Sequence, residues 1–453
     1  MPMFDTVLIA NRGEIAVRIQ RACEHLGLKT VMVYSQGDAG AAYLEYADRA
    51  VCIGPAAPGQ SYLDKTAVLC AALASGAQAI HPGYGFLSEN GEFSQAVTDA
   101  GLTFIGPSAD CIRRMGDKVA AKQAMRDAGV PCVPGPLGAL PDDKQEVLKI
   151  AAEIGYPVII KAAGGGGGRG MRVVTQHSEL IQAVNVTREE ARRAFGNPEL
   201  YMEKFLGQPR HVEIQVLCDQ HGNGIWLGSR DCSLQRRHQK VLEEAPAPGI
   251  DAGLMERVGV RCVEACMHIG YHGVGTFEFL YEDGEFYFIE MNTRLQVEHP
   301  VTEMTTGIDI VEQQLRVALG ERLSIQQSDV RSLGHALECR INAECAETFI
   351  PNAGTVTRWD LPGGIGVRVD THVRAGYKIP AYYDSMIAKV ITHGATRDQA
   401  LVRMRTALAQ FHVEGVSTNL PLHLQILEDS AFKNGAVDIH HLEAWLKLKQ
   451  GRS

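Results

Sequence analysis

The segment from Gly275 to Asn292 limits the possible folds more than any other part of this 453-residue chain. Apolar and polar residues alternate on both sides of the pair Asp283-Gly284, which is typical of a β-hairpin. One register keeps a whole face apolar: it pairs Phe277 with Met291, Phe279 with Ile289, and Tyr281 with Tyr287. We expect this register, with an odd-length loop at 283–285, because a slip of one residue would set Phe277 against Glu290.

The other face of this hairpin carries two acidic residues that oppose each other. The same register sets Glu278 directly across from Glu290, with Asn292 beside them. Opposed carboxylates repel unless something neutralises them, and Mg²⁺ is typically held by one or two carboxylates together with nucleotide phosphates. A solvated strand face is the alternative, but Arg294 and Glu298 follow at once and crowd more charge past the strand end. We interpret this face as a divalent-metal site.

A run of glycines lies between two apolar segments that have the pattern of strands, Pro157–Lys161 and Met171–Thr175. Gly164–Gly168 cannot stabilise a helix or a strand, because no side-chain packing offsets the loss of backbone entropy. Such a loop can turn its N–H groups toward phosphate oxygens, with Lys161 adding charge at its base. The Gly-Lys-Ser/Thr of a P-loop is missing. A flexible linker is the alternative, but the flanking strands favour a lid over a bound phosphate.

Two further segments concentrate charged residues. Arg230–Lys240 holds three arginines, a histidine and a lysine in a chain that is acidic overall. Binding of an anion, either a substrate oxyanion or a phosphate, is at least as good an interpretation as a solvated face or a nucleic-acid contact. The second segment is Glu338–Glu344. Strand alternation would put Glu338, Arg340 and Asn342 on one face, which is either part of a functional site or a salt-bridged sheet surface.

The chain begins with the pattern of a βαβ unit. Thr6–Ala10 and Thr30–Tyr34 are short apolar runs, and apolar residues recur at helical spacing between them. This predicts an α/β start with a parallel sheet, in a first domain of residues 1–114. A smaller α+β piece, a long and mostly antiparallel β region over 211–292, and a final third of strands and helices are expected to follow.

Composition argues against several classes of protein. The net charge of −9 disfavours broad binding to nucleic acids or anionic membranes, so we expect neither as a partner. The 11 cysteines are scattered without a Cys-x-x-Cys pair, which is typical of reduced thiols in the cytoplasm. The start of the chain has no signal-peptide pattern, and no stretch is long and apolar enough to span a bilayer. We expect a soluble, cytoplasmic protein.

Eight strings spread over nearly the whole chain resemble biotin carboxylase, the component of biotin-dependent carboxylases that belongs to the ATP-grasp superfamily. They are Ile9–Ile15, His81–Asn90, Met115–Lys118, Gly164–Arg172, Arg230–Lys240, Met291–Thr306, Glu338–Glu344 and Tyr382–Met386. The resemblance implies an ATP-grasp fold, α/β and α+β in class, with a Rossmann-like N-terminal domain at 1–114. An ATP-grasp domain would occupy 115–334, with a small mobile lid at about 131–205. A C-terminal antiparallel-sheet domain would occupy 335–446.

The resemblance also implies roles for individual residues. The ATP-binding set would be Lys118, Lys161, Gly167, Gly168, Glu203, Lys204, Phe205, Leu206, His211, Gln235, His238, Glu278 and Glu290. Mg²⁺ or Mn²⁺, as two ions, would be held by Glu278, Glu290 and Asn292. Bicarbonate and biotin would be bound by Lys240, Arg294, Gln296, Val297, Glu298 and Arg340. Among these, Glu298 would deprotonate bicarbonate, Arg340 would stabilise the biotin enolate, and Lys240 and Arg294 would complete the catalytic group.

The implied reaction is the ATP-dependent carboxylation of biotin through carboxyphosphate. It is the first half-reaction of acetyl-CoA carboxylase, which supplies malonyl-CoA for fatty acid synthesis, or of a related acyl-CoA carboxylase. No Met-Lys-Met biotin-acceptor sequence occurs in the chain, so the implied partners are a biotin carboxyl carrier protein and carboxyltransferase subunits, with a second copy forming a homodimer.

Two other functions stay open at this point. Another ATP-grasp ligase would share the lid and the metal hairpin but need not carry the strings Arg294–Pro300 and Glu338–Glu344. A non-catalytic nucleotide-binding regulator would be expected to lack Arg294 or Glu298, and both are present.

Overall fold

The computed structural model describes residues 4–136, 138–162, 170–435 and 437–450. The chain opens with a five-stranded parallel sheet in the order β3-β2-β1-β4-β5. Its strands are β1 (Thr6–Ile9), β2 (Lys29–Tyr34), β3 (Arg49–Cys52), β4 (Ala79–His81) and β5 (Thr103–Phe104). The helices of this part are α1 (Gly13–His25), α2 (Lys65–Ser75), α3 (Gly91–Asp99) and α4 (Ala109–Gly116). The βαβ start predicted from the sequence is confirmed.

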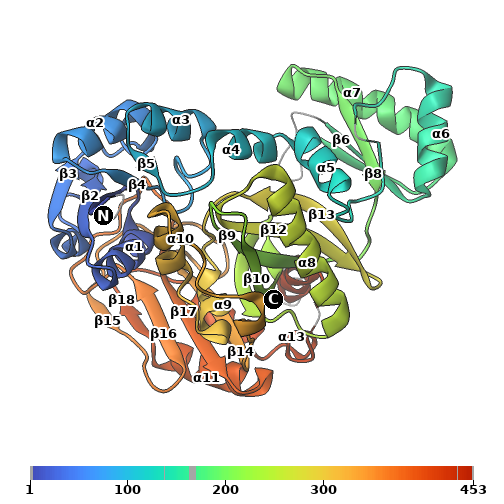
Figure 1. Ribbon diagram of the computed structural model, residues 1–453. Coiled ribbons are helices and arrows are strands. Elements are labelled where there is room, and N and C mark those ends of the chain that lie inside the picture. Colours follow the sequence, from blue (N-terminus) through green and yellow to red (C-terminus); the bar gives the residue numbers. More distant parts are fainter. Residues whose placement is uncertain (1–3, 137, 163–169, 436, 451–453) are drawn as a thin grey trace.

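A small second unit stands away from the rest of the molecule (Figure 1). Helix α5 (Lys118–Asp127) leads to it, and its antiparallel sheet has the order β7-β6-β8. Its elements are α6 (Lys144–Ile154), β6 (Val158–Ala162), β7 (Met171–Val174), α7 (Leu180–Phe195) and β8 (Leu200–Lys204). Both ends of this unit are hydrogen-bonded to the hairpin of residues 273–292. Phe288 N–H donates to Pro131 O at 2.8 Å, and Gln208 N–H donates to Glu282 Oε1 at 2.5 Å.

The largest sheet has eight strands in the order β13-β12-β9-β10-β11-β14-β17-β16. They are β9 (Arg210–Cys218), β10 (Gly224–Arg236), β11 (Gln239–Ala245), β12 (Gly273–Glu282), β13 (Glu285–Asn292), β14 (His335–Asn342), β16 (Val367–Thr371) and β17 (Met386–Gly394). All its neighbouring strands are antiparallel. The pairing of β11 with β14 joins the middle and the end of the chain into one sheet, while the domain boundaries drawn from the sequence remain a prediction.

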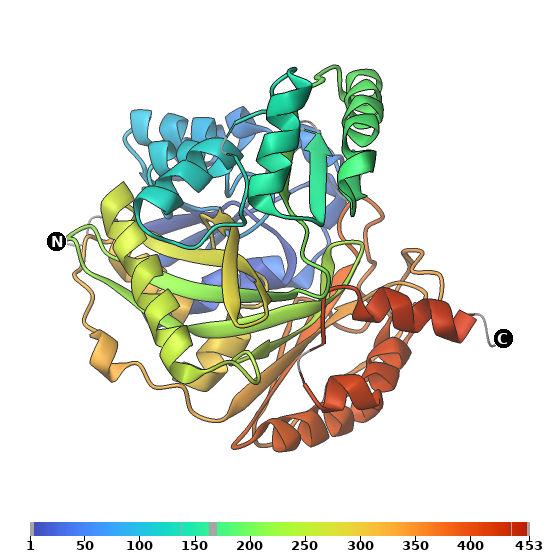
Figure 2. The same ribbon diagram turned by 90° about the vertical axis from the view of Figure 1, so that its right-hand side faces the viewer.

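Helices and a small second sheet complete the C-terminal half. The helices are α8 (Ala252–Ile269), α9 (His299–Thr306), α10 (Ile310–Ala318), α11 (Arg397–Gln410), α12 (Leu420–Ile426), α13 (Ser430–Lys433) and α14 (His441–Gln450). Strands β15 (Arg358–Asp360) and β18 (His412–Glu414) pair with each other. Figure 2 shows the C-terminal helices at the lower right, beside the large sheet, and the small unit at the top. Among the described helices, none is long and apolar enough to cross a membrane.

The hairpin β12–β13 has the predicted register only at its open end. Phe277 pairs with Met291 and Glu278 with Glu290, as predicted. The predicted odd loop at 283–285 is wrong, because Asp283 and Gly284 form a two-residue turn with φ of 52° and 84°. Both positive angles are those of a type I′ turn, the preferred connection for a twisted hairpin.

A bulge after Glu278 absorbs the one-residue difference between the tight turn and the open end. It sets Phe279 opposite Phe288 and Leu280 opposite Tyr287, so the predicted pairs of Phe279 and Tyr281 are also wrong. The buried face is instead formed by Phe277, Phe279, Phe286, Phe288 and Met291.

The antiparallel region expected over 211–292 is interrupted by α8. Asp251 caps this helix by accepting from Leu254 N–H at 2.8 Å, and Gly270 ends it in the left-handed conformation. Its buried residues include Met255, Val258 and Cys262, which recur at helical spacing. The signal was present in the sequence, but strand-like segments on both sides concealed it.

Gly334 lies where the chain enters β14, and we expect its replacement by Ala to destabilise the fold. A Cβ there would lie 2.2 Å from Gly394 O, and the φ of +72° strains any L side chain. Left-handed strain and the displaced neighbour together predict a loss of about 2–4 kcal/mol in the free energy of unfolding. Urea unfolding against Gly363→Ala, whose Cβ would meet nothing within 4 Å, measures it. Equal midpoints for the two variants would contradict the crowding.

Candidate active site

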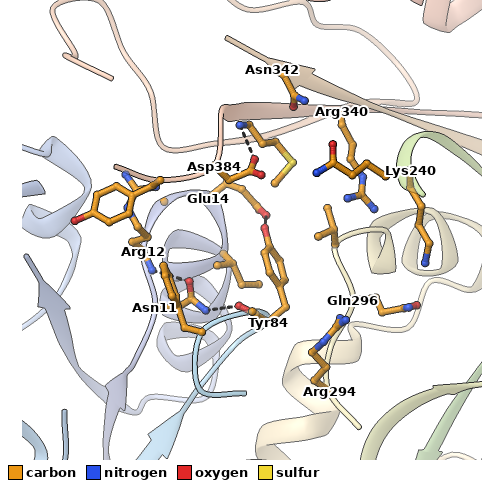
Figure 3. Close-up of a pocket in the computed structure, with 18 of the residues that line it drawn as sticks. Asn11, Arg12, Glu14, Tyr84, Lys240, Arg294, Gln296, Arg340, Asn342 and Asp384 are labelled. Atoms are coloured by element: carbon orange, nitrogen blue, oxygen red, sulfur yellow. Dashed lines mark hydrogen bonds between the residues drawn. The ribbon is translucent and has the colours of Figure 1, made fainter. Parts of the chain in front are cut away.

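A cavity of about 700 Å³ opens between the parallel sheet and the large antiparallel sheet. One wall comes from the loops after β1 and β4, and it carries Asn11, Arg12 and Tyr84. The facing wall comes from β11, β14 and the segment before α9, and its polar groups include Lys240, Arg294, Gln296, Glu298 and Arg340. In Figure 3, Tyr84 stands between the N-terminal side chains and Lys240, Arg294, Gln296 and Arg340. Segments far apart in sequence therefore meet at one cavity.

Glu298 lies between two cations on the second wall. Its Oε1 accepts from Lys240 Nζ at 2.8 Å, and its Oε2 accepts from Arg340 Nη2 at 2.9 Å. The side chain is only 2% exposed. Burial raises the pKa of this carboxyl, but Lys240 and Arg340 outweigh burial and lower the pKa below its ordinary value. Glu298 is therefore ionised at neutral pH and can accept a proton.

Lys240 links this carboxylate to two others. Its Nζ donates to Glu278 Oε1 at 2.9 Å and makes a further short contact with Glu213. Burial alone would lower the pKa of the ammonium group, but Glu213 and Glu278 outweigh it, and the pKa of Lys240 rises well above its ordinary value. Lys240 therefore keeps its charge at the centre of an acidic cluster.

Glu278, Glu290 and Asn292 come together at the end of the hairpin, as the register predicted. Glu278 is buried and faces the exposed Glu290 directly across the strands. Asn292 Nδ2 donates to Glu278 Oε1 at 2.7 Å. Two carboxylates and an amide oxygen are the donors that a hard divalent cation takes, so these three residues fit a metal site.

His211 on β9 borders the same carboxylates. Its Nε2 lies 3.2 Å from Glu278 Oε2 and 3.3 Å from Glu213 Oε1. Burial lowers the pKa of the imidazole, but Glu278 and Glu213 outweigh it and raise that pKa to about 9. The imidazole is therefore a further cation beside the candidate metal ligands.

The segment Arg230–Lys240 divides into two parts with different roles. Arg230 is fully buried, and its guanidinium N–H groups are used inside the protein. They donate to Glu213, Gln215, Thr276, Gln296 and Thr302. Arg230 is thus a structural hub, whereas the interpretation as an anion-binding group still applies to the end of the segment, where His238 and Lys240 line the cavity. Gln235, which is buried, pairs with Lys240 across the turn between β10 and β11.

Arg294 and Gln296 are held by neighbours on both sides. Arg294 Nε donates to Glu89 Oε2 at 2.7 Å, and its Nη2 donates to Asn292 Oδ1 at 2.7 Å. Gln296 Nε2 donates to Glu278 Oε1 at 2.8 Å. The next residue, Val297, accepts from Lys389 Nζ at 2.8 Å through its carbonyl oxygen. The segment 294–298 is therefore rigidly placed along the cavity wall.

In the small unit, the residues predicted to contact the nucleotide lie around Glu203. Its two carboxyl oxygens accept from Lys161, at 2.5 Å, and from Lys122. Lys204 Nζ ties the unit together by donating to the carbonyls of 155 and 156. The N–H groups of 204 and 205 already donate to the carbonyls of 134 and 157. An adenine bound beside Phe205 and Leu206 would therefore form its hydrogen bonds with other backbone groups. Gly167, Gly168 and the side chain of Lys118 lie outside the described residues.

Sequence reasoning missed four residues that shape this site. Glu213 anchors Lys240, and Glu89 anchors Arg294. Tyr84 reaches the cavity from the N-terminal side, where its hydroxyl donates to Glu14 (Figure 3). A signal for Glu213 existed, because polar residues stand at every second position of β9 at 211, 213 and 215. Glu14, Tyr84 and Glu89 lie in strings already noted, but nothing local indicates what they contact.

Comparison with known proteins matches three family domains along the chain. Residues 3–112 match the family described as the biotin carboxylase N-terminal domain, and 338–444 match the biotin carboxylase C-terminal domain. Residues 117–326 match the ATP-binding domain of the carbamoyl-phosphate synthase L chain.

Individual relatives match over the whole length. Biotin carboxylase of Pseudomonas aeruginosa is 62% identical over 446 residues, which is 98% of this chain and 99% of that protein. Biotin carboxylase 1 of Bacillus subtilis is 52% identical over 98% of this chain and 99% of that protein. The biotin carboxylase–β-γ-ATP complex from Campylobacter jejuni superimposes with a TM-score of 0.90 at 47% identity, covering 97% of this chain and 99% of that one. The chain belongs to the biotin carboxylase family and is an ATP-dependent ligase that carboxylates biotin.

Proposed function

We propose that the cavity wall of Lys240, Arg294, Glu298 and Arg340 holds bicarbonate and biotin side by side during this reaction. The observation that carries the proposal is the position of Glu298, whose two oxygens are bound separately by Lys240 and Arg340. A fixed base between two cations can receive a proton on one side while an anion is bound on the other. The biotin carboxylase domain of a thermophilic 2-oxoglutarate carboxylase, solved bound to bicarbonate, is 46% identical over 98% of both chains with a TM-score of 0.93.

Bicarbonate is a poor electrophile and must be activated before it can react. The proposed residues first bind it and then deprotonate it. Lys240 and Arg294, with Gln296 and the backbone of Val297, bind the anion through charge and hydrogen bonds. Glu298 removes its proton, so that the oxygen can attack the terminal phosphorus of ATP. The bond to the bridging oxygen breaks, ADP leaves, and carboxyphosphate forms. Because carboxyphosphate hydrolyses readily, closure of the unit at about 131–205 as a lid would exclude water.

Arg340 is assigned to biotin. The ureido nitrogen of biotin is very weakly acidic, so its deprotonated form needs a permanent positive charge at the enolate oxygen. Arginine provides that charge because it does not lose its own proton at physiological pH. The Nε and Nη2 atoms of Arg340 are held by Glu243 and Glu298, which keeps the guanidinium turned to the cavity.

We propose that ATP binds between this wall and the small unit. Lys161, Glu203, His211, Gln235 and His238 contribute to the nucleotide site. Glu278, Glu290 and Asn292 would hold Mg²⁺ or Mn²⁺, as two ions, which neutralise charge on the phosphates. A neighbour from Hydrogenobacter thermophilus was solved with MgADP and bicarbonate, which supports Mg²⁺ here.

We further propose that the biotin is delivered by a separate carrier protein. The 453 residues contain no Met-Lys-Met sequence, so the acceptor lysine would lie outside them. A carboxyltransferase would then use the carboxybiotin, with acetyl-CoA or another acyl-CoA as acceptor. A homodimer is proposed because the Hydrogenobacter neighbour is described as a dimer. A cytoplasmic location fits 11 cysteines that are all free.

Release of ADP, measured while bicarbonate and free biotin are varied independently, tests the proposed function. We expect no turnover without bicarbonate and a strong stimulation by biotin. Turnover that ignores biotin but responds to an amine would contradict the proposal and indicate a different ATP-grasp ligase.

A further inference from the structure

Two buried glutamates behind Arg340 face each other across the large sheet. Glu243 on β11 is the direct cross-strand partner of Glu338 on β14. Both side chains are 0% exposed. Cβ atoms of directly opposed residues lie only about 4.5–5.5 Å apart in an antiparallel pair, so two ionised carboxylates here would repel strongly.

The hydrogen bonds of this pair are unequal. Glu243 Oε1 accepts from Arg340 Nε at 2.6 Å and lies 2.5 Å from Nη2. Within the described part of the chain, neither Glu243 Oε2 nor either carboxyl oxygen of Glu338 has a donor. A buried carboxylate without a donor is costly, whereas one added proton turns Glu338 into a donor toward Glu243 Oε2. A single proton would therefore relieve the repulsion and satisfy two of the three oxygens that lack a hydrogen bond.

The surrounding charges favour the same distribution. The charged and titratable groups around the pair come from several elements. They are Arg340 of β14, Lys240 of β11, Lys389 of β17, Glu298 before α9, Tyr84 after β4 and, through Lys389, Glu14 of α1 together with Arg368 and Asp370 of β16. Lys389 Nζ is already bound by Val297 O at 2.8 Å and lies 3.3 Å from Glu14 Oε1. Arg340 donates to Glu243, whereas Glu338 acts on the guanidinium through its charge alone.

The effects on acidity agree with this geometry. Burial raises the pKa of Glu338 well above its ordinary value, Lys389 opposes the rise, and Glu243 adds to it. Burial also raises the pKa of Glu243, against the opposing effect of Arg340. Since only Glu243 is bound to a cation by hydrogen bonds, it is the member that stays ionised.

We propose that Glu243 and Glu338 share one proton, carried by Glu338, and that Glu338 thereby acts as a positioning residue for Arg340. With Glu338 neutral, two carboxylates rather than three act on the Arg340 guanidinium. These are Glu243 and Glu298, one on each side. When Glu298 accepts a proton, only Glu243 remains to balance Arg340, so the arginine offers most positive charge as the biotin enolate forms. This last step rests on the proposed role of Arg340, whereas the shared proton does not.

Infrared spectroscopy of the whole protein tests the proton directly. A protonated carboxyl group absorbs apart from carboxylates, and we expect such a band at neutral pH in the unaltered protein. It should weaken in Glu338→Gln and persist in Glu264→Gln, a control at an exposed position of α8. A spectrum in which Glu338→Gln removes no carboxylic-acid intensity would overturn the shared proton, whatever the enzyme does.

Kinetics tests the positioning role. Glu338→Gln keeps a neutral donor toward Glu243, so we expect biotin-dependent ADP release within roughly threefold of the unaltered enzyme at neutral pH. Burial and Glu243 raise the pKa of Glu338, so the shared proton is lost only as the pH rises. The alkaline fall in biotin-dependent turnover should therefore move to higher pH in Glu338→Gln, and superimposable pH profiles would overturn the role.

Glu243→Gln provides the second variant. It removes the carboxylate that holds Arg340, and we expect the KM for biotin to rise about 10- to 100-fold, the value of a lost charged hydrogen bond. Bicarbonate-dependent ADP release without biotin should change much less. A variant that merely disturbs the fold would lower both activities together, and that result would count against the positioning role.

Discussion

Replacement of Glu298 by Gln is expected to lower bicarbonate-dependent ADP release by about 10²- to 10⁴-fold, the contribution of a positioned general base. Glutamine keeps the size and the polar atoms of the side chain, so the cavity should keep its shape. It cannot accept the proton of bicarbonate, and its amide N–H₂ group would face Lys240 or Arg340, which now lie 2.8 Å and 2.9 Å from the carboxylate. Steady-state ADP release at saturating bicarbonate, with and without biotin, measures the loss.

Glu256→Gln, at an exposed position of α8, makes the same chemical change away from the cavity and should leave turnover unaltered. The unfolding midpoint of Glu298→Gln should also be recorded, because two partly buried cations lose a partner. Full activity in a folded Glu298→Gln variant would remove Glu298 from the role of base and leave the task to another carboxylate of the cluster, such as Glu213.

The sequence predicted the parts of the fold that depend on short-range patterns. The βαβ start, the strands around the glycine run and the opposition of Glu278 and Glu290 all follow from alternation and helical spacing. The turn at Asp283-Gly284 was predicted wrongly because a two-residue type I′ turn conflicted with the register expected at the open end of the hairpin. The bulge after Glu278 allows both the tight turn and that register. A bulge that reconciles two correct local signals leaves no pattern of its own in the sequence.

The site was predictable where one strand or one loop carries several of its groups. Residues 290–298 form such a segment, and they meet around Glu278 as expected. Contacts made between distant segments left no local signal. The pairing of Glu243 with Glu338 and the bond of Glu89 to Arg294 depend on strand order and on the placement of the N-terminal sheet. Likewise, the segment that begins at Arg230 was interpreted as an anion-binding group or a solvated face, and only the internal hydrogen bonds of Arg230 reveal a buried hub.

The variant Arg340→Ala should separate the two chemical steps that Glu298→Gln disables together. The guanidinium is proposed to stabilise the biotin enolate, so we expect the stimulation of ADP release by biotin to fall by about 10²- to 10³-fold, as when one donor to a developing oxyanion is removed. ADP release with bicarbonate alone should fall much less, since Lys240 still holds Glu298. Arg340→Lys should recover little, because an ammonium group cannot span Glu243 and Glu298 as the guanidinium does. Arg374→Ala, at an exposed arginine, is the control. Equal losses with and without biotin in Arg340→Ala would assign the arginine to bicarbonate activation instead.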